Sequence, residues 1–344
     1  MYDKLINEIV WWIPFKKKRD KYRKLLMDNL KKKDDQTIID VISRTVSLIK
    51  EENDYEIKKS IFKRNVQHIE IGISSFCNRR CWFCPNSLIE RNKNNIELDE
   101  TLFIKLVNEL KEINYSNELC LHRYNEPLYD INLLLKRVKQ VREYLPNCNI
   151  LIYSNGDYLT REYLEQLKIA GVNILSISYY YDHLDKNIEF DIDNIIKPGM
   201  DKLLKKLGLD YKVAYSNPEE AYILHLEYDS MLVIYKATNF KNVGSDRGGT
   251  IDNVRIITRK SQCFLPNFQV IVDYDGNYTP CCNIRSDIEK HKNYILGNIK
   301  TDNVFDIFLN TKIINLRKQL LIDNIEKEDI CAKCSDYRNW KDVF

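Results

Sequence analysis

Cys77, Cys81 and Cys84 give the chain its clearest chemical signature, because they stand in a CxxxCxxC spacing. Close thiolates are the soft ligands that the iron of an iron–sulfur cluster prefers. Three of them can hold three corners of a cubane 4Fe–4S cluster and leave one iron open to a small molecule. A structural zinc site would need a fourth ligand, and no Cys or His follows within the next few residues.

A second group of cysteines lies in the last third of the chain, at Cys263, Cys281, Cys282, Cys331 and Cys334. The segment 270–281 predicts a β-hairpin with an Asp-Gly turn, and the CxxC pair at 331–334 follows a predicted helix at 303–321. Four thiolates in this arrangement suit an iron–sulfur cluster or a zinc ribbon. On spacing alone both alternatives stay open.

Cysteine usage also bears on the compartment in which the protein works. The chain has 10 cysteines among 344 residues, well short of a disulfide scaffold, and its first residues do not read as a secretory signal. We therefore expect a reducing cytoplasm, where closely spaced cysteines indicate metal or redox groups. Two further cysteines, at 120 and 148, fall on or beside predicted strands and are expected in the core.

The elements that must position these groups alternate along the chain from residue 68. Strands are predicted at 68–74, 118–122, 149–153 and 173–178, with helices at 99–113, 129–145, 160–170 and 190–207. Such alternation is typical of βαβ units around a parallel sheet. A less regular pair of strands, 222–227 and 231–235, would bring the number to six. Chemistry in such folds collects at the C-terminal ends of the strands, and the first cysteine loop follows the first strand.

The first 66 residues are predicted to be helical and carry no recognisable chemistry. Aromatic residues at 11–15 precede a basic run at 16–24, which fits contact with an anionic membrane surface or a solvated helix face. No apolar run reaches the roughly 18 residues of a membrane span. A net charge of +3, from 53 basic and 50 acidic residues, gives no general attraction to nucleic acid.

The CxxxCxxC loop resembles the motif of the radical S-adenosylmethionine (SAM) superfamily. The resemblance implies a partial (β/α)6 barrel of the α/β class and a 4Fe–4S cluster whose open iron chelates SAM. The reduced cluster of that family cleaves SAM to a 5′-deoxyadenosyl radical, which abstracts a substrate hydrogen. We expect a helical extension at 1–66, the barrel at 67–250 and a cluster-binding domain at 251–344.

The same resemblance implies contacts to SAM. Phe83 is expected to meet the adenine through its backbone, and Glu126 to bind the amino group. The family commonly has two glycines before that Glu, whereas this chain has Tyr124 and Asn125. Further SAM-binding positions carried over by register are Ser154 and Asn155 after the third strand, Ser176 and Ser178 on the fourth, and Arg247 in a glycine-flanked loop. Arg247 would pair with the SAM carboxylate or an anionic substrate group.

The C-terminal cysteines resemble the reduced form of the SPASM module known as the twitch domain, which holds one auxiliary 4Fe–4S cluster. The resemblance implies Cys263, Cys281, Cys331 and Cys334 as its ligands. The Gly-x4-Cys spacing from Gly276 favours Cys281 over Cys282, which would be a free thiol close to the cluster. The expected cofactors are therefore two 4Fe–4S clusters and SAM.

The expected activity is a radical SAM oxidoreductase that receives electrons from a flavodoxin or ferredoxin. The favoured reaction is dehydrogenation of a carbohydrate, polyol or cyclitol intermediate, in surface polysaccharide or natural-product biosynthesis, with the auxiliary cluster accepting an electron. One alternative is an epimerase in which Cys282 is the catalytic hydrogen donor, and another is a peptide-modifying enzyme. A remote alternative is a non-catalytic zinc or iron–sulfur protein that binds RNA or a partner through the basic N-terminal segment.

Overall fold

The computed structural model describes residues 16, 20, 23–24, 43–91, 93–252, 254, 262–321, 330–332, 334 and 336. The aromatic and basic segment at 11–24 therefore lies largely outside the described residues. Within the N-terminal region, residues 43–48 are helical and helix α4 spans Tyr55–Asn65. Asp54 caps α4 by accepting a hydrogen bond from the Ile57 amide, as expected for an acidic N-cap.

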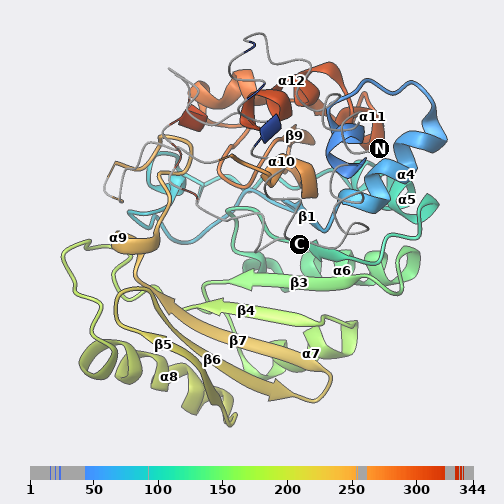
Figure 1. Cartoon of the computed structure of the whole chain (residues 1–344). Helices are drawn as coiled ribbons and strands as arrows, with labels where there is room; N and C mark the ends of the chain where they lie inside the picture. The colour runs from blue at the N-terminus through green and yellow to red at the C-terminus, as the bar shows by residue number, and fades with distance from the viewer. Residues whose placement is uncertain are drawn as a thin grey trace.

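One mixed sheet organises the described part of the chain, with ten strands in the order β10-β9-β8-β1-β2-β3-β4-β7-β6-β5 (Figure 1). The six strands from β8 to β7 in this order pair in parallel. They are β8 (Gln269–Val272), β1 (His68–Ile71), β2 (Glu118–Cys120), β3 (Asn149–Ser154), β4 (Ile174–Ser178) and β7 (Met231–Thr238). The sheet does not close, which agrees with the predicted partial barrel.

Antiparallel strands extend both ends of this parallel sheet. At one end β5 (Lys212–Asn217) and β6 (Ala221–Tyr228) follow β7, and at the other β9 (Asn277–Thr279) and β10 (Gly297–Asn298) follow β8. Of the strands predicted at 222–227 and 231–235, only the second joins the parallel set. Both segments are strands as predicted, but the expectation that both complete the six strands of the barrel was wrong, because the two residues between β6 and β7 allow only an antiparallel hairpin.

The sixth parallel strand comes instead from the predicted C-terminal hairpin. Strand β8 pairs in parallel with β1, from His68 opposite Gln269 to Ile71 opposite Val272. Helix α4 likewise reaches the C-terminal region, where Phe62 packs edge-on against Phe305 and Phe308. The barrel and the C-terminal segment thus share a sheet, while the boundary expected near residue 250 stays a prediction.

The crossover helices pack their apolar faces against the sheet, and polar caps start them. They are α5 (Glu100–Glu112), α6 (Ile131–Tyr144), α7 (Arg161–Ala170) and α8 (Lys197–Leu207). Asp99, Asp130 and Thr160 accept amide hydrogen bonds at the starts of the first three. A short 3-10 turn (Pro127–Asp130) precedes α6, and a π-helical turn (Ile192–Ile196) precedes α8.

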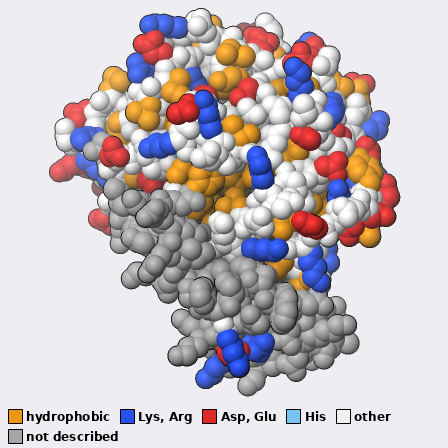
Figure 2. Space-filling view, turned by 90° about the horizontal axis from the view of Figure 1, so that it is seen from above, with side chains coloured by type: hydrophobic (Ala, Val, Ile, Leu, Met, Phe, Trp, Pro, Cys, Tyr) orange, Lys and Arg blue, Asp and Glu red, His pale blue; other side chains and the backbone are white. Residues whose placement is uncertain are grey.

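The single helix predicted at 303–321 is divided into α11 (Val304–Phe308) and α12 (Thr311–Leu320). The prediction was wrong because Asn310 interrupts the run and starts a new helix by accepting from the Ile313 amide. No described helix is long and apolar enough to cross a membrane. On the face shown in Figure 2, the described basic and acidic side chains are interspersed, which agrees with the balanced composition.

Candidate active site

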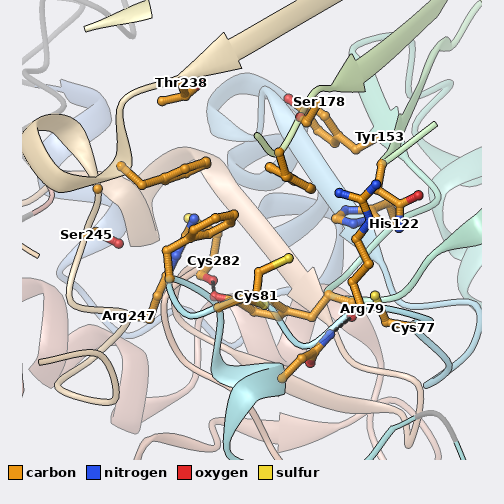
Figure 3. Close-up of a pocket in the computed structure, with 18 of the residues that line it drawn as sticks. Cys77, Arg79, Cys81, His122, Tyr153, Ser178, Thr238, Ser245, Arg247 and Cys282 are labelled. Atoms are coloured by element: carbon orange, nitrogen blue, oxygen red, sulfur yellow. Dashed lines mark hydrogen bonds between the residues drawn. The ribbon is translucent and has the colours of Figure 1, made fainter. Parts of the chain in front are cut away.

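A cavity of about 720 Å³ opens at the C-terminal ends of the parallel strands, where the fold class places chemistry. Its walls come from the CxxxCxxC loop after β1, the turns after β2 and β3, the ends of β4 and β7, and the segment that follows β9. In Figure 3, Cys81, Cys282 and Arg247 lie around the same space, with His122 and Tyr153 across it. Segments far apart in sequence therefore meet in one site.

Cys77, Cys81 and Cys84 all line this cavity. Their loop turns back through a hydrogen bond from the Cys84 amide to the Cys81 carbonyl at 3.0 Å, and the Trp82 amide donates to the His183 carbonyl at 3.1 Å. Burial raises the pKa of the Cys77 thiol to about 12 and also raises that of Cys81. Binding iron would therefore displace protons from these thiols.

Phe83 also lines the cavity, and its ring is stacked on Phe240, with centroids 3.9 Å apart and planes 9° from parallel. The Tyr180 ring lies 5.1 Å from Phe83 and closes the same aromatic group. The packing fixes the backbone of the CxxxCxxC loop beside the cavity. The contact of this backbone with the adenine of SAM stays a prediction.

The turn after β2 contains a left-handed backbone conformation although it has no glycine. Tyr124 has a φ of 55°, in the left-handed region that glycine enters most easily. Its hydroxyl donates to the Cys282 carbonyl at 2.6 Å. Asn125 closes the turn by accepting from the Arg123 amide at 2.7 Å. The side chains of Tyr124 and Asn125 thus replace the expected glycines at the cavity wall.

Glu126 joins the turn after β2 to the turn after β3. Its carboxylate accepts from the Ser154 hydroxyl and the Asn155 amide, both at 2.7 Å, and from the Leu128 amide at 3.1 Å. Burial raises the pKa of Glu126 to about 7 despite these hydrogen bonds. The carboxylate is thus held in place at the cavity wall with Ser154 and Asn155, which also line the cavity.

The turn after β3 is also tied to the cysteine loop. Asn155 donates to the Asn78 side chain at 2.8 Å, and Asp157 accepts from Asn78 and from Arg79, both at 2.7 Å. Gly156 between them has a φ of 78° and allows the tight bend. These contacts set the position of the CxxxCxxC loop relative to β3.

The fourth strand contributes only one of its two predicted serines. Ser178 lines the cavity, whereas Ser176 is buried two residues earlier and is not among the lining residues. Both face the same side of β4, but Ser176 lies deeper below the strand end. Arg247 lines the cavity from a backbone with φ 48°, and its guanidinium contacts the Asn283 side chain at 3.4 Å, while its pairing with SAM or substrate stays a prediction.

The second group of cysteines gathers around Cys281. Cys263, Cys331, Cys334 and Cys282 are all near enough to Cys281 to raise the pKa of its thiol electrostatically, in addition to the larger effect of burial. Cys282 lines the cavity and Cys281 does not. Cys282 thus lines the cavity, while its neighbour Cys281 lies near Cys263, Cys331 and Cys334.

The described residues contain no group of three His, Cys, Asp or Glu side chains placed to hold a single metal ion. A zinc ion would need its ligands at about 2.3 Å for sulfur, whereas a cube of iron and sulfide takes thiolates that stand further apart. All described cysteines are free of disulfides. Cysteines free of disulfides can serve as the thiolate ligands of iron–sulfur clusters.

Sequence reasoning missed several polar residues of the cavity, among them Glu70, Tyr153, Lys236 and Thr238. Strand alternation was the available signal. Glu70 lies two residues after His68 in β1, so both polar side chains point to the same face of the sheet. Burial alone would raise the pKa of Glu70, but His68 and Arg123 outweigh it and hold that pKa at about 2. The deep polar wall is thus anionic at Glu70.

His122, in the turn after β2, also lines the cavity. Burial lowers the pKa of His122 to about 4, so its imidazole is neutral near pH 7. Its ring lies edge-on to Tyr153, with centroids 5.6 Å apart. A neutral imidazole and a phenol can each donate or accept hydrogen bonds to a hydroxyl-rich ligand.

Known proteins resemble the chain over both regions. The radical SAM superfamily model matches residues 71–196, and the model of the SPASM iron–sulfur cluster-binding domain matches residues 263–335. The S-adenosyl-L-methionine-dependent 2-deoxy-scyllo-inosamine dehydrogenase of Niallia circulans is 27% identical over 269 residues, covering 78% of this chain and 92% of that protein. The GTP 3′,8-cyclase of Nautilia profundicola is 29% identical over 165 residues, covering 44% of this chain and 48% of that protein.

Among solved structures, BtrN in complex with AdoMet and 2-DOIA superposes with a TM-score of 0.57 and 27% identity, covering 80% of this chain and 96% of that one. BtrN in an open conformation has the same fold, with a TM-score of 0.51 and 23% identity over 79% of this chain and 92% of that one. The chain is an enzyme of the radical SAM superfamily, with a C-terminal SPASM-type domain and two 4Fe–4S clusters.

Proposed function

We propose that this enzyme dehydrogenates a secondary alcohol of a carbohydrate or cyclitol. The observation that carries the proposal is the placing of adjacent Cys281 and Cys282, one among the C-terminal cysteines and the other in the wall of the cavity that holds the CxxxCxxC thiols. A dehydrogenase must remove a hydrogen atom, an electron and a proton from the alcohol. The similarity to a 2-deoxy-scyllo-inosamine dehydrogenase over 92% of its length supports the same class of reaction.

The residues at the CxxxCxxC loop fit a cluster that binds SAM. Three thiols line one cavity, and a carboxylate, a hydroxyl and an amide side chain stand beside them at Glu126, Ser154 and Asn155. Cys77, Cys81 and Cys84 would be the ligands. When it is bound and reduced, the cluster cleaves SAM to a deoxyadenosyl radical that removes the substrate hydrogen.

The protein's own residues would hold SAM and the alcohol. Glu126, in its ionised form, would receive the SAM ammonium, and Phe83 would present its backbone to the adenine. The hydroxyls of the substrate would meet the polar wall at Glu70, His122 and Tyr153, where one anionic and two neutral groups offer both donors and acceptors. The aromatic group at Phe83, Tyr180 and Phe240 would exclude water from the reacting carbon.

The electron would leave through the wall formed by Cys282. Cys263, Cys281, Cys331 and Cys334 would ligate the auxiliary cluster, and the support for this is that Cys281 lies near the other three and adjoins Cys282 of the cavity lining. A cluster held by these four thiolates would have no open iron for substrate and would serve as an electron acceptor. A flavodoxin or ferredoxin in the cytosol is proposed as the donor that starts each cycle.

Epimerisation is the second candidate, and the observation that favours it is the Cys282 thiol in the cavity lining. A thiol on the far side of a planar carbon radical could return a hydrogen atom with inverted configuration. The thiyl radical would then take up an electron and a proton, supplied by the auxiliary cluster and solvent. Dehydrogenation is favoured because the similarity over most of the chain is to a dehydrogenase.

The first test is the count of iron and acid-labile sulfide on anaerobically reconstituted protein. Wild type is expected to hold about eight irons and the C77A/C81A/C84A variant about four, because each 4Fe–4S cluster contributes four. The same samples, with SAM and dithionite, are then given inositols and sugars while 5′-deoxyadenosine and new carbonyl groups are quantified. Deoxyadenosine from wild type without any carbonyl product across the panel, but with inverted alcohols, would replace dehydrogenation by epimerisation.

A further inference from the structure

We propose that Lys236 anchors an oxyanion of the substrate, a phosphate or a carboxylate, so that the enzyme acts on an anionic sugar or cyclitol. The inference rests on the proposed function, since it names the class of alcohol that the same cavity receives.

Lys236 faces the cavity from the C-terminal end of β7, directly opposite Ser178 of β4. Its ammonium lies 5.3 Å from the centre of the Tyr153 ring, which belongs to β3. No hydrogen bond or ion pair joins the Lys236 ammonium to any described residue, whereas its backbone carbonyl accepts from the Tyr179 amide within the sheet. The side chain is half-buried, so the amine is neither fully solvated nor neutralised by the protein.

The other cationic side chains around the cavity have partner groups within the protein. Arg79 is paired with Asp157, and Arg123 with Asp273 and Glu70. Glu70 also faces His68, while Arg247 contacts Asn283 and lies near Asp336. Lys236 thus differs from these groups, because its charge meets no carboxylate in the described part of the chain.

An unpaired amine away from bulk water is costly, because desolvation disfavours the charged form. Burial accordingly lowers the pKa of Lys236. An incoming oxyanion would restore the charge balance, and the hydroxyls of Tyr153, Ser178 and Thr238 lie in the same wall to complete its hydrogen bonds. A cationic substrate group would instead be repelled by Lys236.

Binding can be measured without turnover. Isothermal titration of anaerobic, reconstituted, SAM-loaded enzyme, without reductant, compares glucose with glucose 6-phosphate and glucuronate, and myo-inositol with myo-inositol 1-phosphate. We expect at least one anionic ligand to bind wild type at least tenfold more tightly than its neutral parent. K236M should remove most of that ratio and K236R should keep it, because the charge is retained. The control K241M removes a nearby lysine whose ammonium donates to the Ile188 carbonyl and lies near Asp182, and it should behave as wild type.

The proposal fails if wild type shows no preference for any anionic member of the panel, or if the preference survives in K236M. It also fails if K236M weakens only SAM binding, because Lys236 would then hold the SAM carboxylate. Comparing the affinities of the phosphate ligands with that of glucuronate shows which of the two oxyanions Lys236 binds. Circular dichroism and iron content check the folding of each variant, and K236R supplies a second, charge-conserving test. Reductive cleavage of SAM by wild type is counted separately, so failure of the proposed function is distinguishable from failure of the anion site.

Discussion

Arg123 is the side chain whose loss should reveal how the barrel and the cysteine-bearing C-terminal segment are joined. It lies at the end of β2 and is almost completely buried, with a side chain 1% exposed. Its guanidinium donates to Asp273 at 2.6 Å and to the Cys282 carbonyl at 3.3 Å. It also donates to the Ile284 carbonyl. One guanidinium therefore holds segments about 150 residues apart in sequence.

The Arg123→Met variant keeps much of the side-chain volume and removes the charge. Asp273 would be left buried without its cation, since it is itself 1% exposed. Breaking one partner of a buried ion pair costs about 3–5 kcal/mol. The two backbone carbonyls would also lose their donor, so we expect a value in the upper half of that range. Displacement of the segment around Cys282 should lower the occupancy of the auxiliary cluster and spare the first one.

The assay is urea unfolding of anaerobic protein followed by circular dichroism, together with iron counts. In R123M/D273N the unpaired carboxylate is gone, so the two substitutions should couple by about 1–3 kcal/mol relative to their sum. The matched control is K136M, which breaks the exposed pair of Lys136 with Glu100 and should leave the midpoint nearly unchanged. If R123M unfolds like K136M and keeps about eight irons, the proposed joining role of Arg123 is wrong.

Three further predictions follow from the polar groups at the site. Because the pKa of Glu126 is raised to about 7, the Kd for SAM should increase about tenfold from pH 8 to pH 6 in wild type, and titration of E126Q should show weaker binding without that slope. Burial lowers the pKa of His68, but hydrogen bonds with Glu118 and Glu70 outweigh it and raise that pKa to about 9. The stabilisation that protonated His68 gives the folded state is complete below about pH 6.5 and is lost as the pH rises through about 9. The urea midpoints of wild type and H68Q should therefore converge above about pH 9. Parallel midpoint profiles would contradict the raised pKa of His68. In C282A, dehydrogenation should persist and reactions in D2O should give product without carbon-bound deuterium, whereas deuterium in the wild-type product that C282A lacks would indicate epimerisation.

Much of the fold and the first cluster loop could be predicted from sequence because their determinants are local. The CxxxCxxC spacing lies within eight residues, and the helix starts follow from neighbouring caps such as Asp99 and Thr160. The alternation of strands and helices likewise depends on side-chain periodicity over short windows. These features need no knowledge of distant contacts, and the parallel sheet follows from them.

Other features depended on contacts that no local pattern encodes. Spacing favoured Cys281 over Cys282 as the ligand, but only packing places one thiol among the C-terminal cysteines and the next at the cavity. The sequence predicted a glycine-free turn with uncertain geometry, and the hydroxyl contact of Tyr124 with the Cys282 carbonyl supports its left-handed backbone.

The sequence by itself determined the family, the cluster loop and the order of the elements, because spacing and periodicity are short-range properties. Only the tertiary structure decided that β8 completes the parallel set, that Arg123 meets Asp273, and that Lys236 faces the cavity without a counter-charge. Strand alternation can say which face a residue takes, but pairing across the sheet decides what it meets there. Contacts such as that of Arg123 with Asp273 join residues more than a hundred positions apart. These long-range contacts shape the cavity.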